Sequence, residues 1–195
     1  MWATRANNLT SFPMNMGSVV FVKLFLCGSF LILTTCGPKP PAQMVKAERI
    51  QAITASSQSP AFPPTLLLDG VPHAENAWHS AVGSLLPQWI QLQFRQPLRV
   101  RQFGLQAQFN SPGNPTDNLR RAPRKLEVWG SDDREFKTYQ NLGSFECAYA
   151  APGEWCERSI SATGKAHLYF RFVIVENGGD TAFVTIQEMN LFAED

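Results

Sequence analysis

Apolar and polar residues alternate along several short stretches of the chain. In residues 89–94, Ile90, Leu92 and Phe94 are separated by single glutamines. This period of two is typical of a β-strand with one buried face. The same alternation predicts further strands at residues 101–105, 125–129, 168–175 and 183–192.

Clusters of turn-forming residues separate these stretches. Gly130-Ser131-Asp132-Asp133 follows one predicted strand, and Asn177-Gly178-Gly179-Asp180 follows another. Such clusters favour tight turns, and long helical periodicity is not evident in the sequence. Short alternating strands joined by turns predict an all-β fold, an antiparallel jelly-roll β-sandwich.

The first 35 residues have a different pattern. Residues 24–33 are mostly apolar, Arg5 and Lys23 precede them, and a proline-rich stretch follows at residues 38–41. This order predicts an export signal over residues 1–35. An uncleaved membrane anchor is one alternative, although a span needs about 20 apolar residues and Lys23 interrupts any longer run. A buried helix is another, which the proline-rich stretch disfavours.

Leu33-Thr34-Thr35-Cys36 resembles the lipobox of bacterial lipoproteins. The resemblance implies that Cys36 is lipidated, becomes the new N-terminus and tethers an exported protein to a membrane of the cell envelope. Gly37 follows Cys36 where the best-known inner-membrane retention signal has Asp, which favours the outer membrane. We therefore expect a tether over residues 36–45 and one folded domain over residues 46–195.

The net charge of the chain argues against nucleic-acid binding. Of 17 basic and 16 acidic residues, only Arg5 and Lys23 precede Cys36, so the remainder has a net charge of −1 and no footprint for nucleic acid.

Cys147 and Cys156 are close in sequence, which predicts a disulfide in an oxidising compartment. Two free buried thiols are the alternative, and a metal site would need more ligands nearby.

Catalytic motifs are weakly represented. The three histidines, His73, His79 and His167, lie in separate segments. The sequence holds no Gly-x-Ser-x-Gly elbow and no His-Glu-x-x-His pair. We therefore expect a protein that is not an enzyme.

Several short blocks follow one another along the second part of the chain. Two of them are Asp69-Gly70 and Trp78-His79-Ser80. The others are residues 87–92, 100–105, 123–133, 169–174 and 186–192. In this order the blocks resemble the discoidin, or coagulation factor 5/8 type C, domain, and the resemblance extends from about Ala47 to Phe192. The resemblance implies a galactose-binding-like sandwich, a group that includes many bacterial carbohydrate-binding modules.

The resemblance also implies a structural calcium ion beside the Asp69-Gly70 loop. Calcium takes about 6–8 oxygen ligands, many of them carbonyl oxygens. The matching positions are the side chains of Asp69, Asn76 and Glu188 and the carbonyl groups of Leu66 and Gln187. The alternative is a loop without metal, in which Glu188 pairs with an arginine or with backbone amides.

In this family, sugars or lipids bind at loops at one end of the sandwich. Residues 106–121 form a long polar segment with several glycines and prolines, and such loops are often functional. The candidate ligand-binding residues are His79, Gln108, Asn110, Arg120, Arg121, Trp155 and Asn177. The plainer alternatives are that Trp155 covers the disulfide and that the two arginines belong to a solvated face.

Together these features predict an exported, lipid-anchored, non-catalytic protein that binds a glycan or polysaccharide. The alternative is a structural or protein–protein interaction module of the envelope that binds no sugar. In either case the expected partners include a membrane, through the lipid, and proteins of the envelope.

Overall fold

The computed structural model describes residues 42–71, 76–109, 115–161 and 164–194. The predicted export signal and Cys36 lie outside these residues. In the described part of the chain, no helix is both long and apolar enough to cross a membrane. The elements are β1 (Gln43–Met44), η1 (Ala47–Arg49), β2 (Ile50–Ala55), η2 (Pro64–Leu68), β3 (Trp78–His79), β4 (Gln88–Gln106), α1 (Pro115–Arg121), β5 (Pro123–Ser131), β6 (Gln140–Glu146), β7 (Trp155–Ser159), β8 (His167–Asn177), β9 (Thr185–Ile186) and β10 (Met189–Glu194).

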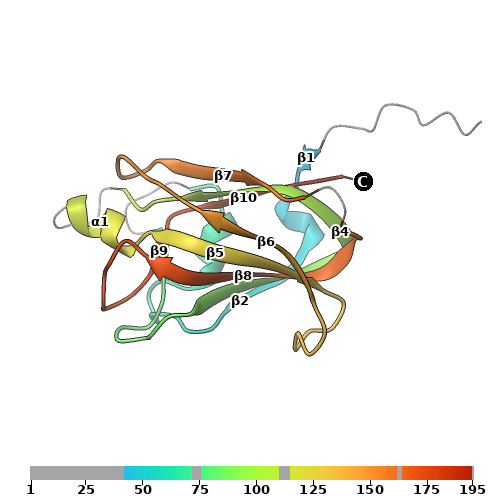
Figure 1. Ribbon diagram of the computed structural model, residues 1–195, viewed down its shortest axis with the longest axis horizontal. Coiled ribbons are helices and arrows are strands. Elements are labelled where there is room, and N and C mark those ends of the chain that lie inside the picture. Colours follow the sequence, from blue (N-terminus) through green and yellow to red (C-terminus); the bar gives the residue numbers. More distant parts are fainter. Residues whose placement is uncertain (1–41, 72–75, 110–114, 162–163, 195) are drawn as a thin grey trace, which may run out of the picture. The chain divides into compact units, whose positions relative to one another are not determined.

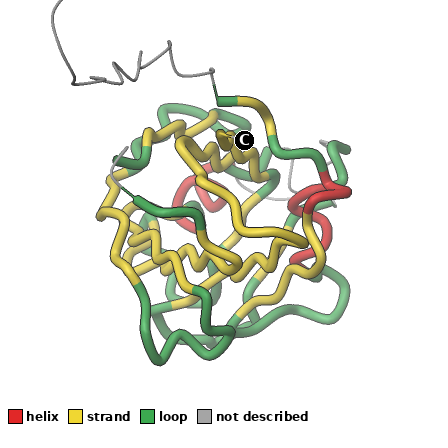
Figure 2. Tube along the Cα trace, turned by 90° about the vertical axis from the view of Figure 1, so that its right-hand side faces the viewer, coloured by secondary structure: helices red, strands yellow, loops and turns green. Residues whose placement is uncertain are grey.

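Strand β4 belongs to both layers of a sandwich (Figure 1). Its first part pairs with β2 and β8, and β8 leads on through β5 to β6. Its last part pairs with β10 and β7, and β10 pairs with β1. All of these pairings are antiparallel, and strands make up most of the regular secondary structure (Figure 2). The predicted all-β jelly-roll sandwich is confirmed.

The sequence pattern predicted separate strands at residues 89–94 and 101–105, but the structure joins them in β4. The pairing of β4 with β8 shifts between Gln93 and Leu98, and the exposed residues 95–97 occupy this bend. The chain reverses its direction at this bend, so both ends of β4 lie at one end of the domain. We call this end, which carries α1 and residues 177–183, the loop end. The corner end carries residues 95–97, 132–139 and 164–167.

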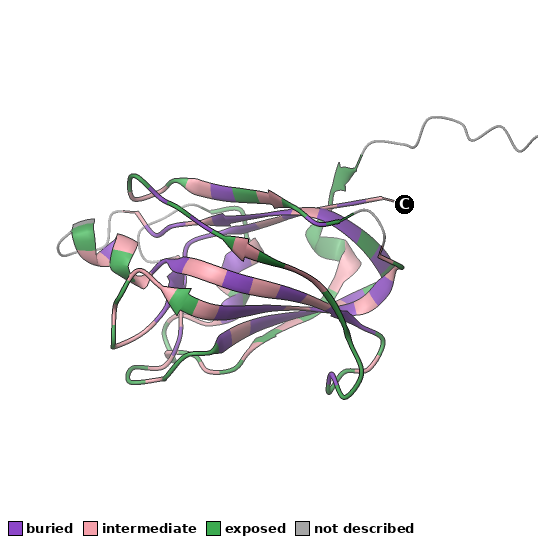
Figure 3. Cartoon of the chain, viewed as in Figure 1, coloured by how far each residue is buried: buried purple, intermediate pink, exposed green. Residues whose placement is uncertain are grey.

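The core lies between the two layers. The rings of Phe103 and Phe172 meet edge to face with centroids 5.3 Å apart, and those of Phe94 and Phe170 are 5.6 Å apart. Such pairs stabilise beyond the area that they bury. Figure 3 shows buried residues running along β8 and β5. Trp78 is also fully buried, so it packs the core and is not a platform for a ligand.

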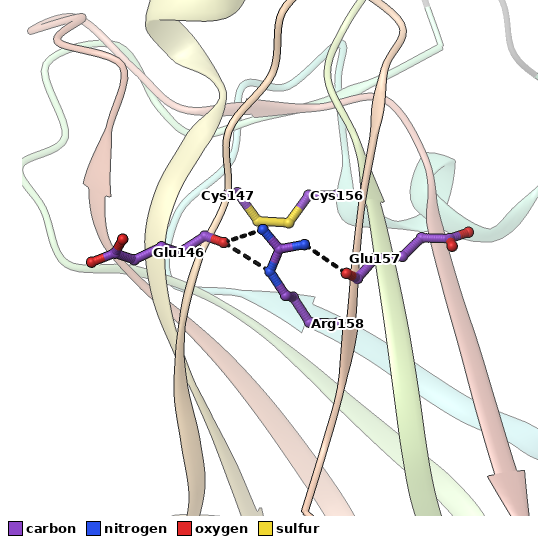
Figure 4. Close-up of a disulfide and its surroundings, with 5 residues drawn as sticks. All are labelled: Glu146, Cys147, Cys156, Glu157 and Arg158. Carbon is purple, nitrogen blue, oxygen red and sulfur yellow. Dashed lines mark hydrogen bonds between the residues drawn. A yellow bond between two sulfur atoms is a disulfide. The ribbon is translucent and has the colours of Figure 1, made fainter.

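A disulfide closes the open edge of the sandwich between β6 and β7. Cys147 follows β6, Cys156 lies in β7, and the two form the predicted bond (Figure 4). Arg158 supports the same junction. Its Nε and Nη2 donate to the Glu146 carbonyl at 2.9 and 2.6 Å, and its Nη1 donates to the Glu157 carbonyl at 2.7 Å. Because β6 and β7 belong to different layers, the disulfide and the two bonds from Arg158 to Glu146 tie the layers together.

Replacing both cysteines with serine should lower the free energy of unfolding by about 2–3 kcal/mol, since the bond restricts a small loop of the unfolded chain. Urea unfolding measures the effect. The domain should still fold, because Arg158 continues to connect the two edges through its bonds to Glu146. Reducing agent should cause the same loss in the unaltered chain and none in the double variant. Equal stability of the two chains under oxidising conditions would contradict this account.

Candidate functional site

The segment after β8 rests directly on α1 at the loop end. The amide of Gly178 donates to the Ala122 carbonyl at 3.1 Å, and the amide of Asp180 donates to the Arg120 carbonyl at 3.1 Å. A Cβ atom on Gly178 would overlap the carbonyl oxygen of Leu119, so only glycine permits this approach. Part of the segment that the sequence suggested was a loop is thus a short helix that supports residues 177–183.

Hydrogen bonds from the side chain of Asn177 hold this segment in its conformation. Its Nδ2 donates to the carbonyl of Asp180 at 2.8 Å, and its Oδ1 accepts from the amide of Gly179 at 2.9 Å. Asp180 in turn accepts from the amide of Ala182 at 2.7 Å. The predicted ligand residue Asn177 therefore holds the loop in shape.

Arg121 is held in a fixed position beside this loop. Its Nε donates to Asp180 Oδ2 at 3.2 Å, and its guanidinium carbon lies 4.5 Å from the centroid of Phe183. Burial would raise the pKa of Asp180, but amides of Ala182 and Phe183 and the Arg121 guanidinium outweigh it and lower that pKa. Within the described residues, the two terminal nitrogens of Arg121 have no hydrogen-bond partner. They form a planar pair of donors whose orientation is already set.

His79 lies next to Arg121, between two aromatic rings. Its imidazole is nearly parallel to Phe62 and Phe183, with centroids 4.1 and 5.5 Å away. Burial, and then the charge of Arg121, lower the pKa of His79 to about 4, so the ring is neutral at pH 7. Its buried Nε2 has no hydrogen-bond partner in the part of the chain that the structure describes. An unpaired buried nitrogen is costly unless something else satisfies it.

A cavity of about 220 Å³ lies against Asp180 and Phe183, the residues that contact Arg121 and His79, although neither Arg121 nor His79 lines it. Its lining combines Leu85, Leu86 and Phe183 with the polar residues Asn177, Asp180 and Thr181. Leu85 is 82% exposed and Val82 is 77% exposed, so apolar surface continues around the cavity. Ligand sites typically combine apolar walls with a few fixed polar groups in this way.

The structure does not gather all the predicted ligand residues here. His79, Arg120, Arg121 and Asn177 come together, and Arg120 Nη2 donates to the Gly179 carbonyl at 3.0 Å. Gln108 is buried just beyond β4, and Trp155 packs on Gly104 in the layer of β7. Asn110 lies outside the described residues. Phe62, Asp180 and Phe183 were missed by the sequence analysis.

Three of the predicted calcium ligands, the side chains of Asp69, Asn76 and Glu188, lie close together. Asn76 Nδ2 donates to Asp69 Oδ2 at 2.7 Å, and Gln187 Nε2 donates to the carbonyl of Asn76 at 2.8 Å. The carboxyl groups of Asp69 and Glu188 lie close enough for the charge of Asp69 to act on Glu188. Leu66 lies in η2, three residues before Asp69.

Glu188 is a buried acid whose pKa is strongly shifted. It is 6% exposed, and its Oε1 has no hydrogen-bond partner among the residues described. Burial, then the charge of Asp69 and the hydrogen bond with it, raise the pKa of Glu188 to about 7, against the opposing effect of the Gly70 amide. In the described residues, no three His, Cys, Asp or Glu side chains form a group that could hold a metal. A cation here would therefore depend on carbonyl oxygens besides the two carboxylates.

Comparison with solved structures shows the same fold in carbohydrate-binding modules. A family 32 module from Clostridium perfringens NanJ, solved with galactose, has a TM-score of 0.60 at 13% identity over 78% of this chain and 99% of that chain. A second module from that organism, solved with GalNAc-beta-1,3-galactose, has a TM-score of 0.60 at 19% identity over 77% and 100%. An F5/8 type C domain from Bacteroides fragilis has a TM-score of 0.62 at 12% identity over 79% and 97%.

The sequence itself has one informative match. Curated proteins give none. The profile of the F5/8 type C domain, however, matches residues 52–189, which is most of the chain and nearly all of the sandwich. The order of sequence blocks, the two-layered fold and this match agree. The chain belongs to the F5/8 type C domain family.

Proposed function

We propose that this chain is a non-catalytic, lipid-anchored protein of the cell envelope whose domain binds carbohydrate at the loop end. The observation that carries this proposal is the pair Arg121 and His79. Asp180 and Phe183 hold Arg121 with its terminal nitrogens unpaired, and the neutral His79 beside it has an unpaired Nε2. The solved neighbours that contain galactose or GalNAc-beta-1,3-galactose support this ligand class.

Binding at this end would be non-covalent. The planar fork of Arg121 suits two neighbouring hydroxyl groups, since each of its terminal nitrogens donates in a fixed direction. His79 Nε2 would exchange one more hydrogen bond with a hydroxyl group, in the direction that its tautomer allows. Phe183 and Leu85 line the cavity with apolar surface that fits the C–H face of a sugar ring.

The position of β1 is compatible with a tether. β1 pairs with β10 near the C-terminus of the domain, away from α1 (Figure 1). The first described strand of the domain therefore lies on the side away from the loop end. The loop end would stay accessible to polysaccharide, and we propose the outer membrane as the site of attachment.

One observation favours a second candidate function. Val82 and Leu85 are largely exposed at the loop end, and exposed apolar residues also suit a protein partner. In that case the domain would hold an envelope protein and bind no sugar. Co-purification of a protein that is lost when Leu85 is replaced with serine would favour this alternative.

We also propose that calcium binds between Asp69 and Glu188. Two adjacent carboxyl groups, one with its pKa raised to about 7, fit a site where a cation replaces the proton. Asn76 and the carbonyl groups of Leu66 and Gln187 would supply further oxygens. Bound calcium would join η2 to the start of β10.

Replacing Arg121 with lysine should weaken binding of the preferred sugar at least about tenfold, because lysine keeps the charge but loses the planar fork. A glycan array on the purified full-length chain identifies the sugar, and calorimetry measures the affinity. Arg124→Lys is the matched control, since Arg124 lies over Tyr149, away from the proposed site. Equal affinities for the Arg121 and Arg124 variants would argue against this site.

Without calcium, Glu188 should reduce the stability of the domain as the pH rises from about 4.5 to 8. This contribution is read as the difference between the unaltered chain and Glu188→Gln, because the lowered pKa of His79 acts in the opposite direction over part of this range. Unfolded Glu188 titrates near 4.5 and the folded group near 7, so the protonated form stabilises the fold below this window and the benefit, on the order of 3 kcal/mol, is gone above it. Calcium should restore the melting temperature at pH 8.

Glu188→Gln should remove the Glu188 contribution to the pH dependence, leaving that of the two buried histidines, and should remove the response to calcium. Thermal unfolding with calcium chloride or with EDTA measures both. Glu157→Gln, at an exposed position of β7, serves as the control. An unaltered chain that melts at the same temperature with and without calcium at pH 8 would refute the metal site.

Replacing Cys36 with serine should release the chain from the membrane fraction, because a serine cannot carry the thioether-linked lipid. Fractionation of cells that express each chain measures this. Cys27→Ser, within the predicted export signal, should leave the attachment unchanged. If the Cys36 variant stays in the membrane fraction to the same extent, the lipid anchor is wrong.

A further inference from the structure

A second cavity lies at the corner end, and none of the predicted ligand residues lines it. It has a volume of about 260 Å³ and is bordered by the end of β5, the start of β6 and the start of β8. The side chains that matter here are Asp132, Tyr139, Gln140, Lys165 and His167. These residues come from three separate segments, so the cavity exists only in the folded domain.

His167 presents an unsatisfied polar atom in this cavity. It is 2% exposed, and its ring fills the space that a Cβ atom on Gly130 would occupy. Its Nε2 lies 3.3 Å from Gln140 Oε1. Its buried Nδ1 has no hydrogen-bond partner in the described part of the chain, and Asp132 Oδ1 is 3.8 Å away. That gap is too long for a direct hydrogen bond but allows a third polar group to contact both atoms.

The charges in the cavity compensate each other. Lys165 Nζ donates to Asp132 Oδ2 at 2.8 Å, and the amide of Leu168 donates to Asp132 Oδ1 at 3.2 Å. Burial lowers the pKa of His167 more than Asp132 raises it, which favours the neutral ring. A lining with one anion, one cation, an amide and an imidazole offers donors and acceptors without net charge. Hydroxyl groups, which both donate and accept, suit such a lining better than an ion does.

An aromatic ring stands at the edge of the cavity. Tyr139 is 50% exposed and stacks on Trp129, with centroids 4.3 Å apart and planes 20° apart. Trp129 is itself fixed, because its Nε1 donates to Glu127 Oε2 at 2.9 Å. Tyr139 is thus a rigid and accessible aromatic surface beside a cluster of polar groups.

We propose that the corner-end cavity is a second carbohydrate site, which takes one monosaccharide unit. The sugar ring would lie against Tyr139, and its hydroxyl groups would bind Asp132, Lys165 and the free Nδ1 of His167. The small volume limits the enclosed ligand to one unit. This site does not depend on sugar binding at the loop end. With both sites in use, one domain would bridge two glycan chains, since the sites lie at opposite ends.

Hydrogen–deuterium exchange on the full-length chain tests the proposal. The probes are galactose, N-acetylgalactosamine and glucose, each at a saturating concentration. At least one should slow exchange about threefold or more in residues 130–140 and 165–168. Asp132→Asn combined with Lys165→Met should abolish this protection. Lys137→Met, at an exposed position of the same hairpin, should leave it intact.

Two further variants distinguish binding at the corner end from binding at the loop end and from unfolding of the hairpin. Arg121→Lys should leave protection at the corner end unchanged, whatever it does at the loop end. Tyr139→Leu preserves an apolar contact with Trp129 but removes the aromatic face, so it should reduce protection without unfolding the hairpin. The proposal is overturned if no probe protects residues 130–140, or if the Asp132 and Lys165 double variant is protected as strongly as the unaltered chain.

Discussion

The bend in β4 determines how the two layers and the two ends of the domain are arranged. Hydrogen bonds tie one part of this strand to β2 and β8 and the other part to β10 and β7, so a single strand connects the two layers. The bend at residues 95–97 brings both ends of the strand to the loop end. The same bend leaves the ends of β5, β6 and β8 together at the corner end. Both proposed sugar sites follow from this one constraint.

Much of this fold could be predicted from local pattern. The sequence shows the alternation that buries Phe170, Phe172 and Ile174. It also places Cys147 close to Cys156, the pair that forms the disulfide. The continuity of β4 could not be predicted, because three exposed residues interrupt its alternation. The helix α1 has seven residues, which is too short for a clear helical period.

The site was predictable only in part. Blocks shared with the family pointed to His79, Asp69 and Glu188, and the structure brings the two acids together. The role of Phe183 depends on a contact with His79 that spans more than 100 positions of the chain, and Phe62 reaches the same ring from another segment, so a local pattern does not contain either contact. Asn177 has a polar side chain in a loop, as a ligand residue would, but its hydrogen bonds are used within that loop.

The central claim is that Arg121 and His79 hold a sugar at the loop end. A crystal structure of the full-length chain grown with the sugar that binds best on a glycan array tests it most directly. The account predicts a sugar ring in the cavity beside Phe183, with hydroxyl groups within hydrogen-bond distance of the Arg121 terminal nitrogens and His79 Nε2. A ring bound elsewhere, with the loop end empty, would contradict it.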